Sequence, residues 1–102
     1  MIVSVLYKVG AGGKFDLDYY LATHIPLVRK LWGPAGLNSV QVLKGSGTAG
    51  GGAPEISFIA LLDFASMAAF EDAARLHGQE IIGDITNFTD TNPTIQFNEV
   101  IG

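Results

Sequence analysis

Residues Tyr19–Val28 read YYLATHIPLV, a stretch that has the apolar spacing of a helix yet contains a proline. Proline lacks the N–H that a helix interior needs, and its ring clashes with the carbonyl four residues earlier, here that of Ala22, at a cost of roughly 3 kcal/mol. We therefore predict a helix that bends at Pro26 and holds His24 next to the bend.

The direction of the His24 side chain follows from helical geometry. His24 lies seven residues from both Leu17 and Leu31, which places the three side chains within about 20° of one another around an ideal helix. Because the other two are apolar, we expect His24 to point inward, into a cleft between helix and sheet. A histidine with an unperturbed pKa near ~6.5 gives or takes a proton at neutral pH. The alternative is a buried histidine satisfied by a backbone carbonyl or by Tyr20, since the spacing shows no partner acid.

Outward from this helix, the sequence changes to the alternating pattern of strands. Four segments have that pattern: Ile2–Val9, Leu37–Lys44, Glu55–Phe64 and Thr94–Ile101. We expect the helix around YYLATHIPLV to begin after a cap at Asp16 and to end near Trp32. A second helix is predicted over Met67–His77 behind a Ser66 cap, followed by a shorter helical piece over Gln79–Ile85.

The predicted order of elements is β-α-β-β-α-β. Two right-handed crossovers then place both helices on one face of a four-stranded antiparallel sheet, which is the ferredoxin-like sandwich of the α+β class. With 102 residues the chain is the size of one domain, so we expect a single domain over residues 1–102. The strands are apolar enough on both faces to need a second cover. We expect the sheet of another copy to supply it, giving a homodimer in the form of a dimeric α/β barrel.

Composition limits the partners. Six basic and ten acidic residues give a net charge of −4, and the basic ones are scattered, so we expect no nucleic-acid partner. No apolar run approaches the ~20 residues that span a bilayer, and the start MIVSVLYKV lacks the basic-then-apolar order of a secretory signal, which favours a cytoplasmic protein without a membrane partner. The chain has no cysteine, and its two histidines lie more than fifty residues apart without clustered carboxylates. We therefore expect no metal site.

A glycine-rich segment, GSGTAGGGAP at residues 45–54, lies between two predicted strands. A phosphate-binding P-loop would need a strand before it, a helix after it and Gly-Lys-Ser/Thr at its end. We therefore expect a mobile hairpin loop.

The second histidine, His77, lies near the end of the second predicted helix, where the helix dipole favours a cation.

Two segments resemble the EthD family of dimeric α/β barrel proteins, named for a member linked to ethyl tert-butyl ether degradation. FDLDYYLATHIPLVRKLWGPAGL, residues 15–37, looks like the family's first helix, which is rich in aromatic residues and carries a His-x-Pro-Leu element. GDITNFTDTNPTIQFNEVI, residues 83–101, resembles its C-terminal stretch, in which an Asp and an Asn-Phe precede a proline and the last strand.

The resemblance implies a homodimer with a cleft beside the His-x-Pro helix. It assigns a catalytic role only to His24. The other matched positions are candidate ligand-binding residues: Tyr19, Tyr20, Trp32, Asp84, Asn87 and Phe88. Asp84 and Asn87 have an alternative interpretation, in which they cap and brace the short helical piece.

The leading hypothesis for function is a small-molecule pocket in which His24 acts as general base or acid on a hydrophobic aromatic or carbonyl-bearing compound. Relatives implied by the resemblance include accessory proteins of ether degradation, dehydratases and decarboxylases, and related barrels include cofactor-free monooxygenases. Proton abstraction next to a carbonyl, dehydration and decarboxylation need only a positioned imidazole and hydrogen-bond donors. We therefore expect no cofactor. The alternative is a noncatalytic ligand-binding or accessory protein of a degradation pathway.

Overall fold

Four strands form one antiparallel sheet in the computed structural model, which describes residues 1–102. The strands are β1 (Ile2–Tyr7), β2 (Leu37–Lys44), β3 (Phe58–Phe64) and β4 (Thr94–Asn98). They lie in the order β2-β3-β1-β4, and each neighbouring pair is antiparallel. This is the strand order of a ferredoxin-like sandwich, so the predicted α+β fold is confirmed.

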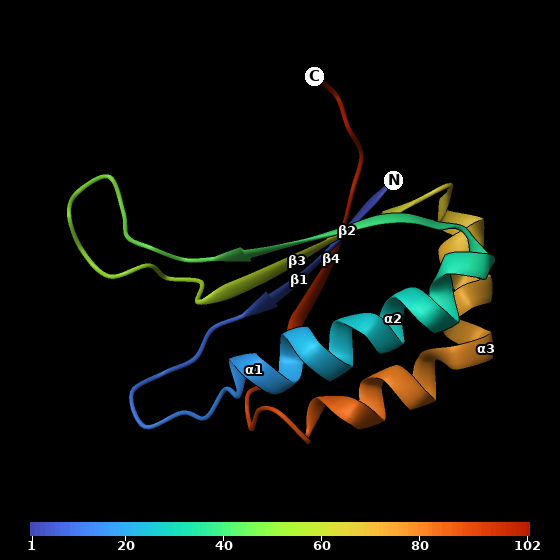
Figure 1. Cartoon of the computed structure of the whole chain (residues 1–102). Coiled ribbons are helices and arrows are strands. Elements are labelled where there is room, and N and C mark those ends of the chain that lie inside the picture. The colour runs from blue at the N-terminus through green and yellow to red at the C-terminus, as the bar shows by residue number, and fades with distance from the viewer.

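The helices lie on one side of this sheet. The first helical region consists of α1 (Leu17–Tyr19), a π-helical turn η1 (Tyr20–His24), α2 (Ile25–Trp32) and a 3₁₀ turn η2 (Gly33–Ala35). The second is α3 (Met67–Ile85). Figure 1 shows α2 and α3 side by side, with the glycine-rich β2–β3 connection extending away from them.

Helix α3 differs from its prediction. It is one continuous helix of 19 residues and does not divide at Gly78. A glycine inside a helix costs only about 1 kcal/mol, and the apolar face that α3 buries through Ala73 and Ile81 outweighs that cost. The predicted cap is confirmed, because the Ser66 hydroxyl accepts a hydrogen bond from the Ala69 N–H at 3.0 Å.

Strand β4 ends three residues earlier than predicted, at Asn98. It is an edge strand whose only neighbour is β1, and Asn98 pairs with Ile2, the first residue of β1. The residues after Asn98 extend past the start of β1, so no strand lies beside them. Without a neighbouring strand they cannot form the backbone hydrogen bonds that define a strand.

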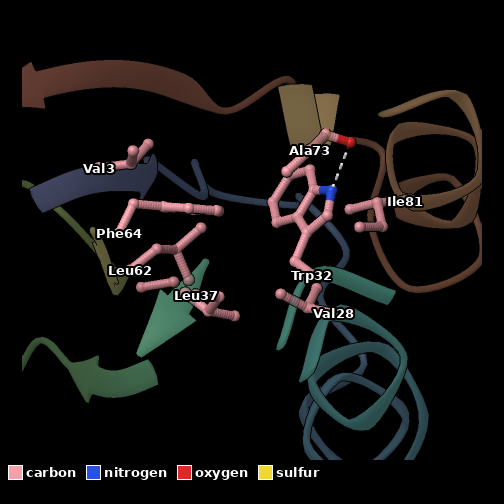
Figure 2. Packing of buried hydrophobic residues seen from close by; sticks show 9 residues of the cluster. Val3, Val28, Trp32, Leu37, Leu62, Phe64, Ala73 and Ile81 are labelled. Carbon is pink, nitrogen blue, oxygen red and sulfur yellow. Dashed lines mark hydrogen bonds between the residues drawn. The ribbon is translucent and has the colours of Figure 1, made fainter. Parts of the chain in front are cut away.

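The main hydrophobic core lies between the sheet and the helices. Figure 2 shows the Trp32 ring of α2 placed between the sheet and α3, with its indole N–H directed at the Ala73 carbonyl. That hydrogen bond is 2.9 Å long and buried. The sheet contributes Val3, Leu37, Ala60, Leu62 and Phe64 to this cluster. A second, smaller cluster joins the other end of the sheet to the first helix: Tyr7, Tyr20, Ile25 and Phe88.

The opposite face of the sheet has no cover within the chain. Because side chains alternate along a strand, Leu6, Leu43 and Leu61 point to this face, and Leu43 is 39% exposed. The same face carries a small polar group, in which the Asn98 amide donates to the Ser4 hydroxyl at 2.8 Å. A homodimer built on this face stays a prediction.

No helix of the chain has the length and apolar character that crossing a membrane requires.

Candidate functional site

The proline is accommodated by a change of helix type. The predicted bend takes the form of the π-helical turn η1, in which the Ile25 N–H bonds to the Tyr20 carbonyl five residues back. A new α-helix, α2, starts at Ile25, so Pro26 falls in its first turn. Proline is tolerated there because the first N–H groups of a helix have no intrahelical partner. Single π turns within helices are frequent at functional sites, and His24 is the last residue of this one.

His24 is buried and bonded to a carboxylate. Only 4% of its surface is exposed, and its Nδ1 lies 2.9 Å from Oδ2 of Asp84, in the last turn of α3. His24 is thus buried and hydrogen-bonded, as in the alternative, but its partner is Asp84 and not a backbone carbonyl or Tyr20. Spacing alone did not indicate this partner, since 60 residues separate the pair. Only the family resemblance pointed to Asp84.

Asp84 is held by two further donors on its other oxygen. The Tyr19 hydroxyl donates to Oδ1 at 2.7 Å, and the Asn87 side-chain amide donates to the same atom at 2.9 Å. The Asn87 N–H also donates to the Asp84 carbonyl at 3.0 Å, so the predicted bracing of the helix end is present as well. These contacts fix the carboxylate that orients the imidazole, as a second shell does for a metal-bound histidine.

The charge states of the pair follow from their surroundings. Burial lowers the pKa of His24 below its ordinary 6.5, against the hydrogen bond and charge of Asp84, which raise it. For Asp84, burial raises the carboxyl pKa, but the hydrogen bonds from Tyr19, Asn87 and His24 outweigh it, and the net pKa is lowered. At neutral pH the carboxylate is therefore charged and the imidazole neutral. A carboxylate only accepts hydrogen bonds, so Nδ1 carries the proton and Nε2 keeps a free lone pair.

Two aromatic rings hold the imidazole in place. Tyr20 stacks on His24 with ring centroids 5.6 Å apart and an interplanar angle of 17°. Phe88, which has no exposed surface, lies at 4.6 Å with a tilt of 55°. Packing on two sides and a hydrogen bond at Nδ1 leave the ring little freedom to rotate, which preorganises Nε2.

A cavity of about 90 Å³ lies next to this histidine, between the sheet and the helices. Fifteen of its 17 lining residues are hydrophobic, and β1, β3, α2 and α3 all contribute to its wall. Ile82 and Ile95 line it yet are 58% and 45% exposed, so they mark its mouth. The Nε2 atom of His24 makes no hydrogen bond within the chain and is not enclosed by it. The cavity therefore offers an apolar space beside a free proton acceptor.

The structure brings most of the predicted site residues together. Asp84, Tyr20 and Phe88 contact His24, and Tyr19 and Asn87 are joined to it through Asp84. Of these five predicted ligand-binding residues, only Tyr20 lines the cavity. Trp32 lines the same cavity but lies in the main core, with its only polar atom bonded to the Ala73 carbonyl. His77 does not line the cavity. It lies in the middle of α3 and not near a helix end as predicted, because the helix continues to Ile85, and its Nδ1 lies 3.6 Å from Oε1 of Glu80.

Most of the apolar residues that line the cavity were not singled out from the sequence, and neither was one residue with a polar group, Tyr7. Tyr7 of β1 lines the cavity, and its ring contacts Tyr20 edge to face at 6.0 Å between centroids. In the sequence it appears as one more apolar member of an alternating strand. The one available signal was a hydroxyl on a strand face that is otherwise aliphatic.

No three His, Cys, Asp or Glu side chains of the chain gather closely enough to hold a metal ion. The His24–Asp84 pair instead has the arrangement of a base and the carboxylate that orients it. This arrangement is suited to taking a proton from a molecule in the cavity.

Comparison with solved structures finds two similar proteins. An EthD-like protein from Ralstonia eutropha JMP134 is 34% identical, with a TM-score of 0.90 over 99% of this chain and 91% of that chain. An ethyl tert-butyl ether degradation (EthD) family protein from Bacillus halodurans C-125 is 15% identical, with a TM-score of 0.59 over 97% of this chain and 100% of that chain, and shows likeness of fold alone. No protein-family model and no curated protein matches the chain.

Proposed function

Because the chain belongs to the EthD-like family, we propose that it binds a small hydrophobic compound in the cavity beside His24 and transforms it by acid/base chemistry without a cofactor. The observation that carries this proposal is the contact of His24 Nδ1 with Asp84 at 2.9 Å, which leaves Nε2 as an unpaired acceptor on a cavity residue. A general base needs an unprotonated acceptor atom within reach of the substrate proton, and a pKa near or below the working pH keeps that atom unprotonated.

The reaction we propose begins with removal of a proton next to a carbonyl. Nε2 of His24 takes the proton, and the electron pair of the broken C–H bond moves onto the carbonyl as an enolate. Asp84 then stabilises the imidazolium, as the buried aspartate does in a serine-protease triad. In a ketone with a β,γ double bond, the imidazolium returns the proton to the γ carbon of the dienolate, which completes an isomerisation. In a β-hydroxy ketone, the imidazolium gives the proton to the leaving hydroxyl, which departs as water and leaves a double bond between the α and β carbons.

The size of the cavity limits what it encloses. Its volume of about 90 Å³ is below the ~150 Å³ of an engineered cavity that holds benzene. The enclosed part therefore suits a group of a few non-hydrogen atoms. A larger aromatic ligand, as the sequence predicts, would extend past Ile82 and Ile95 at the mouth or require the cavity to widen.

Hydrogen exchange tests this proposal without knowledge of the natural substrate. Small ketones such as cyclopentanone are incubated with the protein in D₂O, and loss of the α-proton signal is followed by NMR. We expect exchange above the buffer rate, and a fall of ~10²–10⁴-fold in His24→Gln. His77→Gln is the matched control, since His77 lies outside the cavity. Exchange that is the same in the wild-type protein and in His24→Gln contradicts the proposal.

A second candidate is a noncatalytic binding or accessory protein. The almost entirely apolar cavity lining favours it, because apolar pockets with few polar groups are typical of small-molecule sites in general. Under this function the wild-type protein binds the ketones and is stabilised by them, but shows no exchange above buffer.

We further propose that the working form is a homodimer packed through the uncovered sheet face that carries Leu6 and Leu61. The apolar side chains on that face support it, because a sheet with only one covered face usually presents a polar second face. The dimer is tested below through a substitution at Leu61.

A further inference from the structure

Two buried tyrosines line the same cavity as His24. Tyr7 comes from β1 and Tyr20 from η1, and both line the cavity. Their rings meet edge to face at 6.0 Å, and the Tyr20 ring stacks on the His24 imidazole. Each tyrosine is only 1% exposed.

The hydroxyl groups of these two tyrosines have no partner in the chain. Neither donates nor accepts a hydrogen bond, whereas the nearby Tyr19 hydroxyl donates to Asp84 at 2.7 Å. Buried tyrosine hydroxyls usually find a partner. The one side-chain polar atom that is both fully enclosed and unpaired is Nδ1 of His77. The Tyr7 and Tyr20 oxygens are therefore not fully enclosed by the chain, and both residues line the cavity.

Both hydroxyls keep their protons at working pH. Burial raises the pKa of Tyr20 to about 12. Burial, together with the neighbouring Tyr20, raises the pKa of Tyr7 further above the ordinary value of 10.0. Each group is thus a neutral hydrogen-bond donor. Two residues with an unpartnered donor, Tyr7 and Tyr20, and one with an unpartnered acceptor, His24, thus line a cavity whose wall is almost entirely apolar.

We propose that the Tyr7 and Tyr20 hydroxyls donate hydrogen bonds to a carbonyl oxygen of the ligand, so that the site selects compounds with a carbonyl next to the carbon that faces His24. This inference rests on the proposed function and names its substrate class. When a C–H bond beside the carbonyl loses its proton to Nε2, negative charge develops on the oxygen. Fixed donors aimed at that oxygen stabilise the charge in a water-poor site.

The test compares pairs of ligands with the same shape, of which only one has an acceptor oxygen. Cyclopentanone and methylenecyclopentane form one pair, and butanone and 2-methyl-1-butene form another. Affinities are measured by NMR titration of the wild-type protein, Tyr7→Phe, Tyr20→Phe and His77→Gln. His77→Gln changes a polar side chain that lies outside the cavity, and the hydrocarbon of each pair reports whether a variant keeps an intact cavity.

We expect the wild-type protein to prefer each ketone over its hydrocarbon, and each cavity Tyr→Phe change to reduce that preference by ~2–10-fold, the value of one hydrogen bond. Hydrocarbon affinity stays the same in the two tyrosine variants, and His77→Gln keeps the ketone preference. Equal or undetectable binding of both members of every pair overturns the inference. So does a ketone preference that survives both cavity substitutions, or a parallel loss for ketone and hydrocarbon.

The inference and the proposed function fail in different ways. A ketone preference that depends on Tyr7 and Tyr20, without proton exchange, supports this inference and contradicts catalysis. Exchange that depends on His24, without any effect of the tyrosines on the ketone preference, supports catalysis and contradicts this inference.

Discussion

Nδ1 of His24 and Oδ2 of Asp84 lie 2.9 Å apart, although 60 residues separate them in the chain. The contact joins the end of the π turn η1 to the last turn of α3. It determines which imidazole nitrogen carries the proton, and so makes the other nitrogen the base. The predictions below depend on this contact, on the cavity beside it, and on the uncovered face of the sheet.

Asp84→Asn removes the negative charge that holds the imidazole. Because Asp84 raises the pKa of His24 against the effect of burial, we expect that pKa to fall further in the variant, as followed by NMR titration. Proton exchange into ketones falls at least ~10-fold, since the imidazolium formed in the reaction loses its counter-ion. Asp72→Asn is the matched control, because Asp72 is an exposed carboxylate on the same helix. An unchanged His24 titration in Asp84→Asn contradicts the account.

Stability should depend on pH through the same pair. The folded pKa of His24 lies below its ordinary 6.5, so between these two values the unfolded chain binds more protons than the folded one. The free energy of unfolding therefore falls as the pH drops below 6.5 and levels off below the folded pKa. Asp84, whose pKa is lowered from 3.8, adds a second loss below that value. Urea unfolding at a series of pH values measures both losses of stability. In His24→Gln we expect the loss just below pH 6.5 to disappear. If His24→Gln loses as much stability there as the wild-type protein, the loss does not come from His24.

Gly78 and Gly83 offer a matched pair on α3. An added Cβ at Gly78 meets only the Ala74 Cβ at 3.9 Å, and at Gly83 it meets nothing within 4 Å. Both Gly→Ala variants should therefore be more stable by about 0.5–1 kcal/mol, from helix propensity. Only Gly78 lines the cavity. In NMR titrations, Gly78→Ala should weaken ketone binding, and Gly83→Ala should leave it unchanged. Equal ketone affinities in the two variants would mean that the ketone binds outside this cavity.

Leu61→Lys puts a charge on the uncovered sheet face, in register with Ser4 and Gln41. Burying an unpaired charge in an interface is costly, so we expect the protein to shift from dimer to monomer in sedimentation velocity. Leu76→Lys is the control, because Leu76 is 57% exposed on α3. A wild-type protein that sediments as a monomer at high concentration, or a dimer unaffected by Leu61→Lys, contradicts the proposed interface.

The fold was predictable because its signals are local. Alternation along Leu37–Lys44 and caps at Asp16 and Ser66 are properties of short segments, and the structure has all three. The inward direction of His24 also followed from local helical spacing. The π turn did not, because a proline inside a helical pattern is compatible with either a kink or a bulge.

The partners of His24 depend on tertiary structure. Asp84 reaches the imidazole only because α3 continues through Gly78 instead of ending at His77. Spacing could not indicate that continuation, since a glycine lowers helix propensity without setting a helix end. Tyr7 was missed for a similar reason. Whether its hydroxyl faces a cavity or a partner depends on what packs against the strand.

The proposed role of His24 as a base depends on which imidazole nitrogen carries the proton. Long-range ¹H–¹⁵N NMR at neutral pH distinguishes a protonated imidazole nitrogen from a bare one, and a pH titration follows the change. We expect a neutral ring at neutral pH with the proton on Nδ1, a bare Nε2 whose signal shifts when a ketone is added, and a His24 pKa below 6.5. A proton on Nε2, or a ring that is already doubly protonated at neutral pH, rules out His24 as the base.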